Sequence, residues 1–151
     1  MPKIARKFML HAIELAKKGT GKTFPNPIVG AVIVKGNKLV GAGFHKKAGG
    51  PHAEIIALKK AKQKAHGATL YVTLEPCCHY GKTPPCVDSI IKSGIKKVYL
   101  AMRDPNPLVR GRGIAILRKN GIKVESGICG TIAKKINSSY IKRISKNKET
   151  I

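Results

Sequence analysis

The chain has 151 residues, of which 42% are hydrophobic, 25% are charged and four are cysteine. This length and composition fit a single globular domain with its own core, and they exclude a disulfide scaffold. Charged residues interrupt the first 19 positions, so we expect neither a secretory signal nor a membrane span there. We therefore expect a cytoplasmic protein whose thiols stay reduced.

The net charge of +23 comes from 30 lysine and arginine residues against seven acidic ones. One interpretation is nucleic-acid binding, because cations on one face neutralise phosphates. The other is a compositional bias, because the basic residues are mostly lysine and are spread along the chain. Aromatic residues make up only 5%, which leaves few platforms for stacking bases. We favour the second interpretation, do not expect a nucleic-acid partner, and expect the charge to attract a small phosphorylated substrate.

Hydrophobic periodicity predicts alternating helices and strands along the chain. Helices are predicted at residues 4–18, 52–65, 85–92 and 114–119. Strands are predicted at residues 28–34, 39–44, 69–74, 97–102 and 122–125, the first two forming a hairpin. After Cys129 the sequence becomes polar and basic, with little apolar periodicity. A hairpin followed by alternating helices and strands indicates an α/β fold whose mixed sheet is covered by helices on both faces.

Two local features constrain the hairpin and the loop before it. Gly30, Gly41 and Gly43 weaken the predicted strands, so they indicate bulges or places where another backbone approaches closely. Asn26 lies between two prolines, which excludes regular pairing there and restricts the loop that carries its side chain.

Four residues in the middle of the chain match a catalytic zinc site. His52 is followed two residues later by Glu54, and Cys77 and Cys86 lie nearby in the sequence. Three nitrogen and sulfur ligands with an open fourth position are typical of catalytic zinc, and His-x-Glu before Pro-Cys is the pattern of zinc nucleobase deaminases. The two cysteines are nine positions apart, so the shorter Pro-Cys-x-x-Cys of cytidine and tRNA-adenosine deaminases is absent.

These residues predict hydrolytic removal of an amine. His52 and Cys86 each open a predicted helix, and the field of a helix N-terminus favours thiolate ligands. We expect a zinc-bound hydroxide as the nucleophile and Glu54 as the proton shuttle to the leaving amine. Two alternatives stay open: the cysteines are simply buried hydrophobic residues, or Cys78 or His79 completes a closed structural zinc site.

Five segments carry a resemblance to a known family. They are PNPIVGAVIV, VGAGFHKKAGGPHAE, GATLYVTLEPCCHYGKTPPC, DPNPLVRGRGI and LRKNGIKVESGI, in this order. The chain resembles the deaminase domain of the bacterial riboflavin-biosynthesis bifunctional deaminase/reductase, a member of the cytidine-deaminase-like superfamily, over about residues 9–143. The resemblance implies a three-layer α/β/α sandwich with a mixed central sheet and one zinc ion per chain. The implied reaction converts 2,5-diamino-6-(5-phospho-D-ribosylamino)pyrimidin-4(3H)-one to 5-amino-6-(5-phospho-D-ribosylamino)uracil and ammonia.

The resemblance also implies roles for individual residues. It makes the zinc ligands His52, Cys77 and Cys86, and it makes Glu54 the catalytic residue. The implied substrate-binding residues are Asn26, His45, His79, Lys82, Thr83, Asp104 and Asn106. The chemistry of the side chains agrees, because a lysine offers charge to a phosphate, and carboxylate, amide and hydroxyl groups bond ribose or ring atoms.

The chain departs from the family in two respects. Cys78 stands where a small polar residue such as serine is common. Members of the family usually continue into a reductase domain, and no glycine-rich nicotinamide-binding segment is found here. We therefore predict a deaminase domain at residues 1–145, a polar tail at 146–151, and a separate reductase that acts on the product.

The resemblance leaves the assembly and two other functions open. By analogy with the superfamily we expect a homo-oligomer, whereas physical contact with a reductase is not predicted either way. The alternative functions are a tRNA base deaminase and a catalytically inactive metal-binding module.

Overall fold

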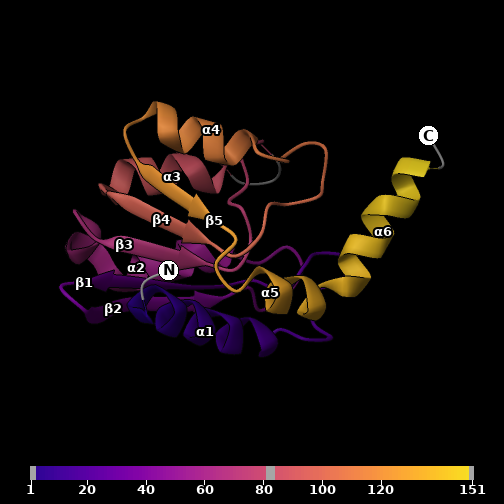
Figure 1. Cartoon of the computed structure of the whole chain (residues 1–151), viewed down its shortest axis with the longest axis horizontal. Helices are drawn as coiled ribbons and strands as arrows, with labels where there is room; N and C mark the ends of the chain where they lie inside the picture. Colours follow the sequence, from indigo (N-terminus) through magenta and orange to yellow (C-terminus); the bar gives the residue numbers. More distant parts are fainter. Residues whose placement is uncertain (1–2, 81–83, 150–151) are drawn as a thin grey trace.

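The helices and strands follow one another much as the sequence predicts as far as residue 126. The structure is a computed structural model that describes residues 3–80 and 84–149 (Figure 1). The helices are α1 (Lys3–Lys17), α2 (Ala53–Ala61), a short 3-10 helix (Lys62–Ala65), α3 (Cys86–Ser93), α4 (Arg112–Lys119), α5 (Gly130–Ile136) and α6 (Ser138–Glu149). The strands are β1 (Gly30–Lys35), β2 (Lys38–Phe44), β3 (Thr69–Val72), β4 (Lys97–Leu100) and β5 (Lys123–Ser126). None of the described helices is long and apolar enough to cross a membrane.

The strands form one mixed sheet in the order β2-β1-β3-β4-β5. β1 runs antiparallel to β2 and β3, whereas β3, β4 and β5 are parallel. The β1–β2 hairpin turns at Gly36 and Asn37, both with positive φ, as a two-residue turn between right-twisted strands requires. Parallel neighbours need crossovers, which α3 and α4 supply. The carboxyl ends of β3 and β4 therefore lie at the same edge, and the segments that follow them meet there.

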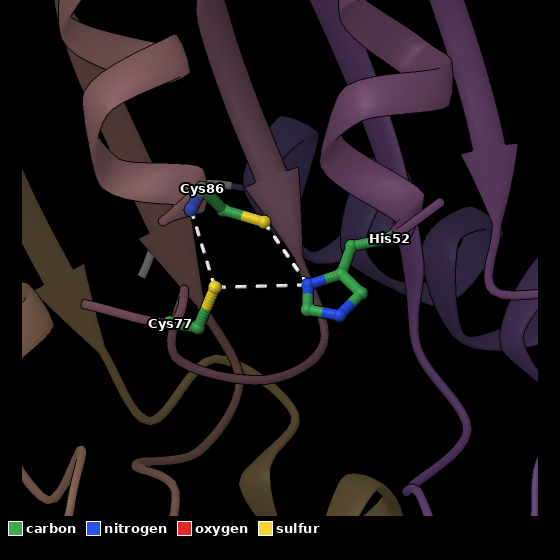
Figure 2. Close-up of side chains that lie close together, drawn as sticks. All are labelled: His52, Cys77 and Cys86. Atoms are coloured by element: carbon green, nitrogen blue, oxygen red, sulfur yellow. Dashed lines mark hydrogen bonds between the residues drawn. The ribbon is translucent and has the colours of Figure 1, made fainter. Parts of the chain in front are cut away.

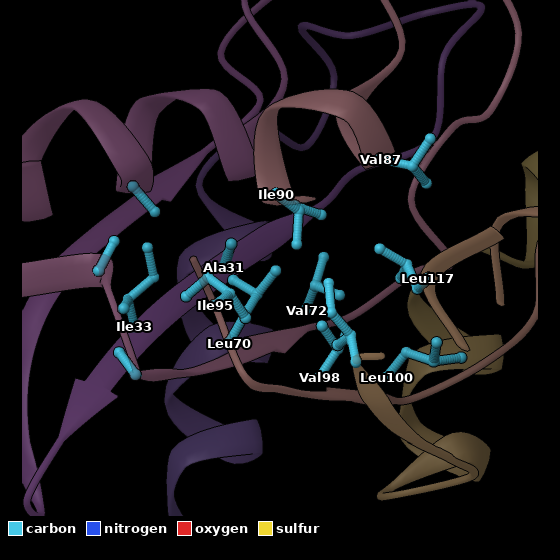
Figure 3. Packing of buried hydrophobic residues seen from close by; sticks show 14 of the residues in the cluster. Ala31, Ile33, Leu70, Val72, Val87, Ile90, Ile95, Val98, Leu100 and Leu117 are labelled. Carbon is cyan, nitrogen blue, oxygen red and sulfur yellow. The ribbon is translucent and has the colours of Figure 1, made fainter. Parts of the chain in front are cut away.

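Helices cover both faces of the sheet, which confirms the predicted three-layer α/β/α sandwich. One core lies between the sheet and α2, α3 and α4, and its buried side chains include Ile33, Leu70, Ile90 and Leu117 (Figure 3). The other core lies between the sheet and α1 and α5 (Figure 1). The two cores lie on opposite faces of the sheet, because successive side chains of a strand point to opposite faces.

The predicted close approaches at the glycines of the hairpin are confirmed. A Cβ atom on Gly30 would overlap the backbone of Ala12 in α1, and one on Gly41 would overlap the backbone of Ala57 in α2. The β1–β2 register also shifts between Ile33 and Val34, which is the predicted irregularity. The hairpin is thus held tightly between two helices, one on each face.

The chain beyond residue 129 differs from the prediction, because it forms two helices. Ala133 of α5 is fully buried, and Ile132 and Ile136 pack against the core beside α1. α6 leaves the body of the domain (Figure 1). Most of its described side chains are exposed or half-buried, so apolar periodicity does not reveal this helix in the sequence.

Candidate active site

His52, Cys77 and Cys86 come together at the edge of the sheet where β3 ends. His52 is the N-cap of α2, Cys86 is the first residue of α3, and Cys77 lies in the segment after β3. The His52 Nδ1 atom lies 3.1 Å from Sγ of Cys86 and 3.6 Å from Sγ of Cys77 (Figure 2). The backbone N–H of Cys86 donates to Sγ of Cys77 at 3.2 Å. Helix N-termini therefore hold two of these side chains and supply a donor to the third.

The donor set and its dimensions fit a tetrahedral zinc ion. Zn–S and Zn–N bonds of about 2.3 and 2.0 Å imply nitrogen–sulfur separations of about 3.5 Å, close to those found here. Hydrogen bonds from Cys86 and His52 lower the pKa of Cys77 to about 4. The hydrogen bond to Cys77, together with burial, raises the pKa of Cys86. Cys77 is therefore the more acidic of the two thiols. A divalent cation held here would leave both deprotonated, because a coordinating thiol is deprotonated outright.

The described residues offer three ligands to such an ion. The ligand atoms of His52, Cys77 and Cys86 lie within 4.8 Å of one another, and neither Cys78 nor His79 belongs to this group in the described part of the chain. The Cys78 thiol instead donates to the carbonyl of Leu108 at 3.5 Å. The closed site with a fourth protein ligand is thus not formed by these residues.

Glu54 is a buried carboxyl group beside the ligand cluster. It lies in the first turn of α2, is 3% exposed, and lines the same cavity as His52 and Cys77. Burial, followed by the negative charge of Cys77, raises the pKa of Glu54 to about 7. A carboxyl group with such a pKa can both accept and return a proton near neutral pH, which is what general acid–base chemistry requires.

A cavity of about 210 Å³ brings most of the predicted site residues together. Of the predicted residues, the following line it: Asn26, His45, His52, Glu54, Cys77, His79, Asp104 and Asn106. Cys86 is buried and is not among the lining residues. Lys82 and Thr83 lie outside the described residues. The segments before β1, after β2, after β3 and after β4 all contribute to this cavity, because they reach the same edge of the sheet.

Two of the lining residues, Asn26 and His45, lie within hydrogen-bond distance of each other. Nδ1 of His45 lies 3.0 Å from the carbonyl oxygen of Pro51, and Nε2 lies 3.2 Å from Nδ2 of Asn26. A carbonyl only accepts, so Nδ1 carries the proton and Nε2 of the neutral ring accepts from Asn26. Burial is the main cause that lowers the pKa of His45, which favours this neutral state. The Asn26 amide donates to His45, and within the described residues its Oδ1 makes no hydrogen bond, so this oxygen can accept one from a ligand.

The segment that follows β4 also lines the cavity. The buried carboxylate of Glu75 accepts backbone N–H groups of Asp104 at 3.2 Å, Gly111 at 2.9 Å and Ile114 at 3.2 Å. Asp104 in turn accepts the backbone N–H of Asn106 at 3.0 Å. These hydrogen bonds hold the segment 104–114 at Glu75, which lies two residues before Cys77 in the chain.

Several lining residues were not predicted. They are Pro27, Val29, Leu74, Glu75, Val109 and Tyr140. The sequence contains a local signal for Glu75. This carboxylate directly follows a buried strand, and a buried carboxylate needs hydrogen-bond donors. Tyr140 had none, because nothing in the sequence connects the C-terminal segment with the loop after β4.

The fold and the site together define a class of protein. An α/β/α domain with a His-Cys-Cys cluster at helix N-termini, and a buried glutamate beside it, matches the zinc nucleobase deaminases. The chain belongs to the family described as the cytidine and deoxycytidylate deaminase zinc-binding region, whose sequence model matches residues 2–102.

Individual relatives narrow this class. The chain is 53% identical over 139 residues to the diaminohydroxyphosphoribosylamino-pyrimidine deaminase of Buchnera aphidicola subsp. Schizaphis graminum, covering 92% of this chain and 95% of that protein. It is 53% identical over 148 residues to the riboflavin biosynthesis protein RibD of Aquifex aeolicus, covering 98% of this chain and 42% of that protein. The structure of Acinetobacter baumannii RibD is similar with a TM-score of 0.93 and 55% identity, over 95% of this chain and 40% of that chain. The chain therefore spans about two fifths of its RibD relatives and nearly all of the Buchnera deaminase.

Proposed function

We propose that the chain catalyses the hydrolytic deamination of 2,5-diamino-6-(5-phospho-D-ribosylamino)pyrimidin-4(3H)-one in riboflavin biosynthesis. The products are 5-amino-6-(5-phospho-D-ribosylamino)uracil and ammonia. The observation that carries this proposal is that His52 and Cys77 of the ligand cluster line one cavity together with the buried carboxyl of Glu54. The name of the Buchnera relative, which matches over nearly its whole length, supports the substrate class.

His52, Cys77 and Cys86 would hold one zinc ion per chain. When bound, such an ion polarises a water molecule enough to make it a nucleophile near neutral pH. Glu54 would take a proton from the attacking water as its oxygen bonds to the ring carbon that carries the amine, and would pass this proton to the adjacent ring nitrogen. Glu54 would then move the proton of the new hydroxyl group to the amine nitrogen, so that the C–N bond breaks, ammonia leaves and the ring carbon becomes a carbonyl.

Other residues of the cavity hold the substrate for this deamination. The Asn26 Oδ1 accepts a hydrogen bond from the ring, and His79 lines the same cavity as Cys77. Asp104 and Asn106, which also line this cavity, bond the ribose or ring substituents. Lys82 and Thr83 are assigned to the phosphate by their chemistry alone. A separate reductase then consumes the product, and the chain acts as a homo-oligomer by analogy with its superfamily.

Ammonia release by the zinc-loaded protein tests this proposal. The substrate is the phosphoribosylated diaminopyrimidinone, and a tRNA transcript is the parallel sample. Turnover of the pyrimidine without base conversion in the tRNA is expected. Inosine or uridine in the tRNA, without turnover of the pyrimidine, would mean that the chain is a nucleic-acid deaminase. Zinc binding without either reaction would mean a metal-binding module.

A further inference from the structure

The corner between α5 and α6 contacts the backbone of the loop that carries Asn26. The Asn137 side chain is 4% exposed and makes two hydrogen bonds to Ile28. The Ile28 N–H donates to Oδ1 of Asn137 at 2.9 Å, and Nδ2 of Asn137 donates to the Ile28 carbonyl at 2.9 Å. Ile28 is two residues after Asn26 and directly follows Pro27, which has no N–H to offer. This pair of bonds therefore satisfies and orients the end of the loop before β1.

One turn further on, the same corner contacts the loop that carries Asp104. Tyr140 is 7% exposed, lines the cavity, and donates its hydroxyl proton to Oδ1 of Asp104 at 2.8 Å. Burial, followed by the charge of Asp104, raises the pKa of Tyr140, so the phenol keeps its proton and remains the donor. Oδ1 of Asp104 also accepts the Asn106 N–H. Among the described residues Oδ2 of Asp104 makes no hydrogen bond to protein, which leaves it for a ligand in the cavity.

A third contact is made by Arg143 of α6. The Arg143 guanidinium lies 4.5 Å from the centroid of the Phe24 ring, and Phe24 is 73% exposed. Tyr140 and Arg143 are three residues apart on α6, a spacing that places helical side chains on one face, and Asn137 directly precedes this helix. The corner thus contacts both the loop that carries Asn26 and the loop that carries Asp104, and both of these residues line the cavity.

We propose that Asn137 and Tyr140 are positioning residues of the deamination site, which set the placement of the Asn26 loop and of the Asp104 carboxylate. This inference rests on the proposed function and extends it, because it makes the start of α6 a part of the active site. Tyr140 acts through Asp104, and Asn137 acts through the backbone of Ile28.

The Tyr140 hydroxyl affects both the direction and the charge of the Asp104 carboxylate. Burial raises the pKa of Asp104, as does the nearby Glu75, whereas the hydrogen bonds from Asn106 and Tyr140 and the charge of His79 lower it. Arg143 adds a positive charge on the other side of Tyr140. Without the hydroxyl, the carboxylate would be protonated at a higher pH, and of its described hydrogen bonds only the one from the Asn106 N–H would remain to orient it.

Kinetics of a double-mutant cycle test the action of Tyr140 through Asp104. The variants are Tyr140→Phe, Asp104→Asn and the two combined, with Ser139→Ala at an exposed neighbour on α6 as the matched control. For Tyr140→Phe we expect about a tenfold loss of kcat/KM, mainly through KM, because a hydrogen bond to a charged group is lost. The acid limb of its pH profile should move to higher pH, and zinc content should stay unchanged. In the Asp104→Asn background, the Tyr140→Phe substitution should lower kcat/KM less than twofold. Losses that multiply in the double variant, or an unchanged Tyr140→Phe enzyme, would overturn the inference.

Amide hydrogen exchange of the zinc-loaded proteins tests the positioning without any substrate. We expect the Asn106 amide to exchange faster in Tyr140→Phe, and the Ile28 amide to exchange faster in Asn137→Ala. Amides in β3 and β4 should keep their protection, which shows that the sheet is intact. Unchanged exchange at Asn106 and Ile28 would contradict the inference. Faster exchange there, in a protein whose wild type does not turn over the pyrimidine, would contradict only the proposed function.

Discussion

The side-chain amide of Asn26 lies 3.2 Å from Nε2 of His45, and only a neutral His45 ring protonated on Nδ1 can accept its hydrogen bond. Two residues 19 positions apart thereby fix each other's orientation at the wall of the cavity. This relationship makes the site sensitive to pH through a residue that is not a metal ligand.

The first prediction concerns the pH dependence that His45 confers. Its pKa is lowered in the fold from the usual 6.5, chiefly by burial, so the unfolded chain binds this proton more readily. The contribution of His45 to the free energy of unfolding is therefore complete above pH 6.5 and is lost as pH falls through the lowered pKa. An NMR titration should show the His45 ring changing protonation below pH 6.5. A midpoint above 6.5 would contradict this account, and His45→Gln should remove that resonance and part of the acid slope of unfolding.

A second prediction separates proton transfer from metal binding. Glu54→Gln keeps the size of the buried side chain but cannot carry a proton, so kcat should fall by about 10²–10⁴-fold. Zinc content should remain one per chain, because Glu54 is not among the three ligands. Glu14→Gln, on the exposed face of α1, is the matched control and should retain full activity. Ammonia release and metal analysis on the same samples measure both effects, and an active Glu54→Gln enzyme would exclude the proposed role.

The third prediction distinguishes the two adjacent cysteines. Cys77→Ser should lose most of its zinc, since the thiolate faces His52 and accepts the Cys86 N–H. Cys78→Ser should keep its zinc and its activity, because the Cys78 thiol contacts the Leu108 carbonyl outside the cluster. Metal-to-protein ratios after dialysis give the comparison. Equal zinc loss in both variants would mean that the second thiol is also a ligand.

A fourth prediction concerns the carboxylate that holds the loop after β4. Glu75→Gln replaces one of the two acceptor oxygens by an N–H₂ group, which cannot accept the backbone N–H groups it would face. We expect the free energy of unfolding to fall by about 1–3 kcal/mol, the usual cost of an unsatisfied buried group. The KM for the pyrimidine should also rise, because Asp104 moves with this loop. Glu125→Gln on β5 serves as the exposed control for denaturant unfolding, and equal effects in the two variants would argue against this role of Glu75.

The local sequence predicted the candidate metal ligands and most of the fold. His52, Cys77 and Cys86 were predicted together with Glu54 because each lies at the start of a helix or just after a strand, where short-range signals are strong. The structure brings the three candidate ligands together. Up to residue 126, the hydrophobic periodicity of each segment predicted the strands, the helices and hence the layers. This signal is also local, because the buried positions of a segment repeat with the period of its secondary structure. Boundaries differ by a few residues, as in α2, which ends at Ala61 and continues as a 3-10 turn.

The remaining features depend on contacts between segments far apart in the chain. Asn137 bonds Ile28 across 109 positions, and Tyr140 bonds Asp104 across 36. A single polar side chain carries no periodicity, so its partner is decided by which loops the sheet order brings to one edge. The sequence by itself predicted the candidate ligands, the candidate catalytic carboxyl and the α/β layers. Only the tertiary structure showed that α5 and α6 are helices and that Tyr140 lines the cavity, because these features depend on where separate loops meet.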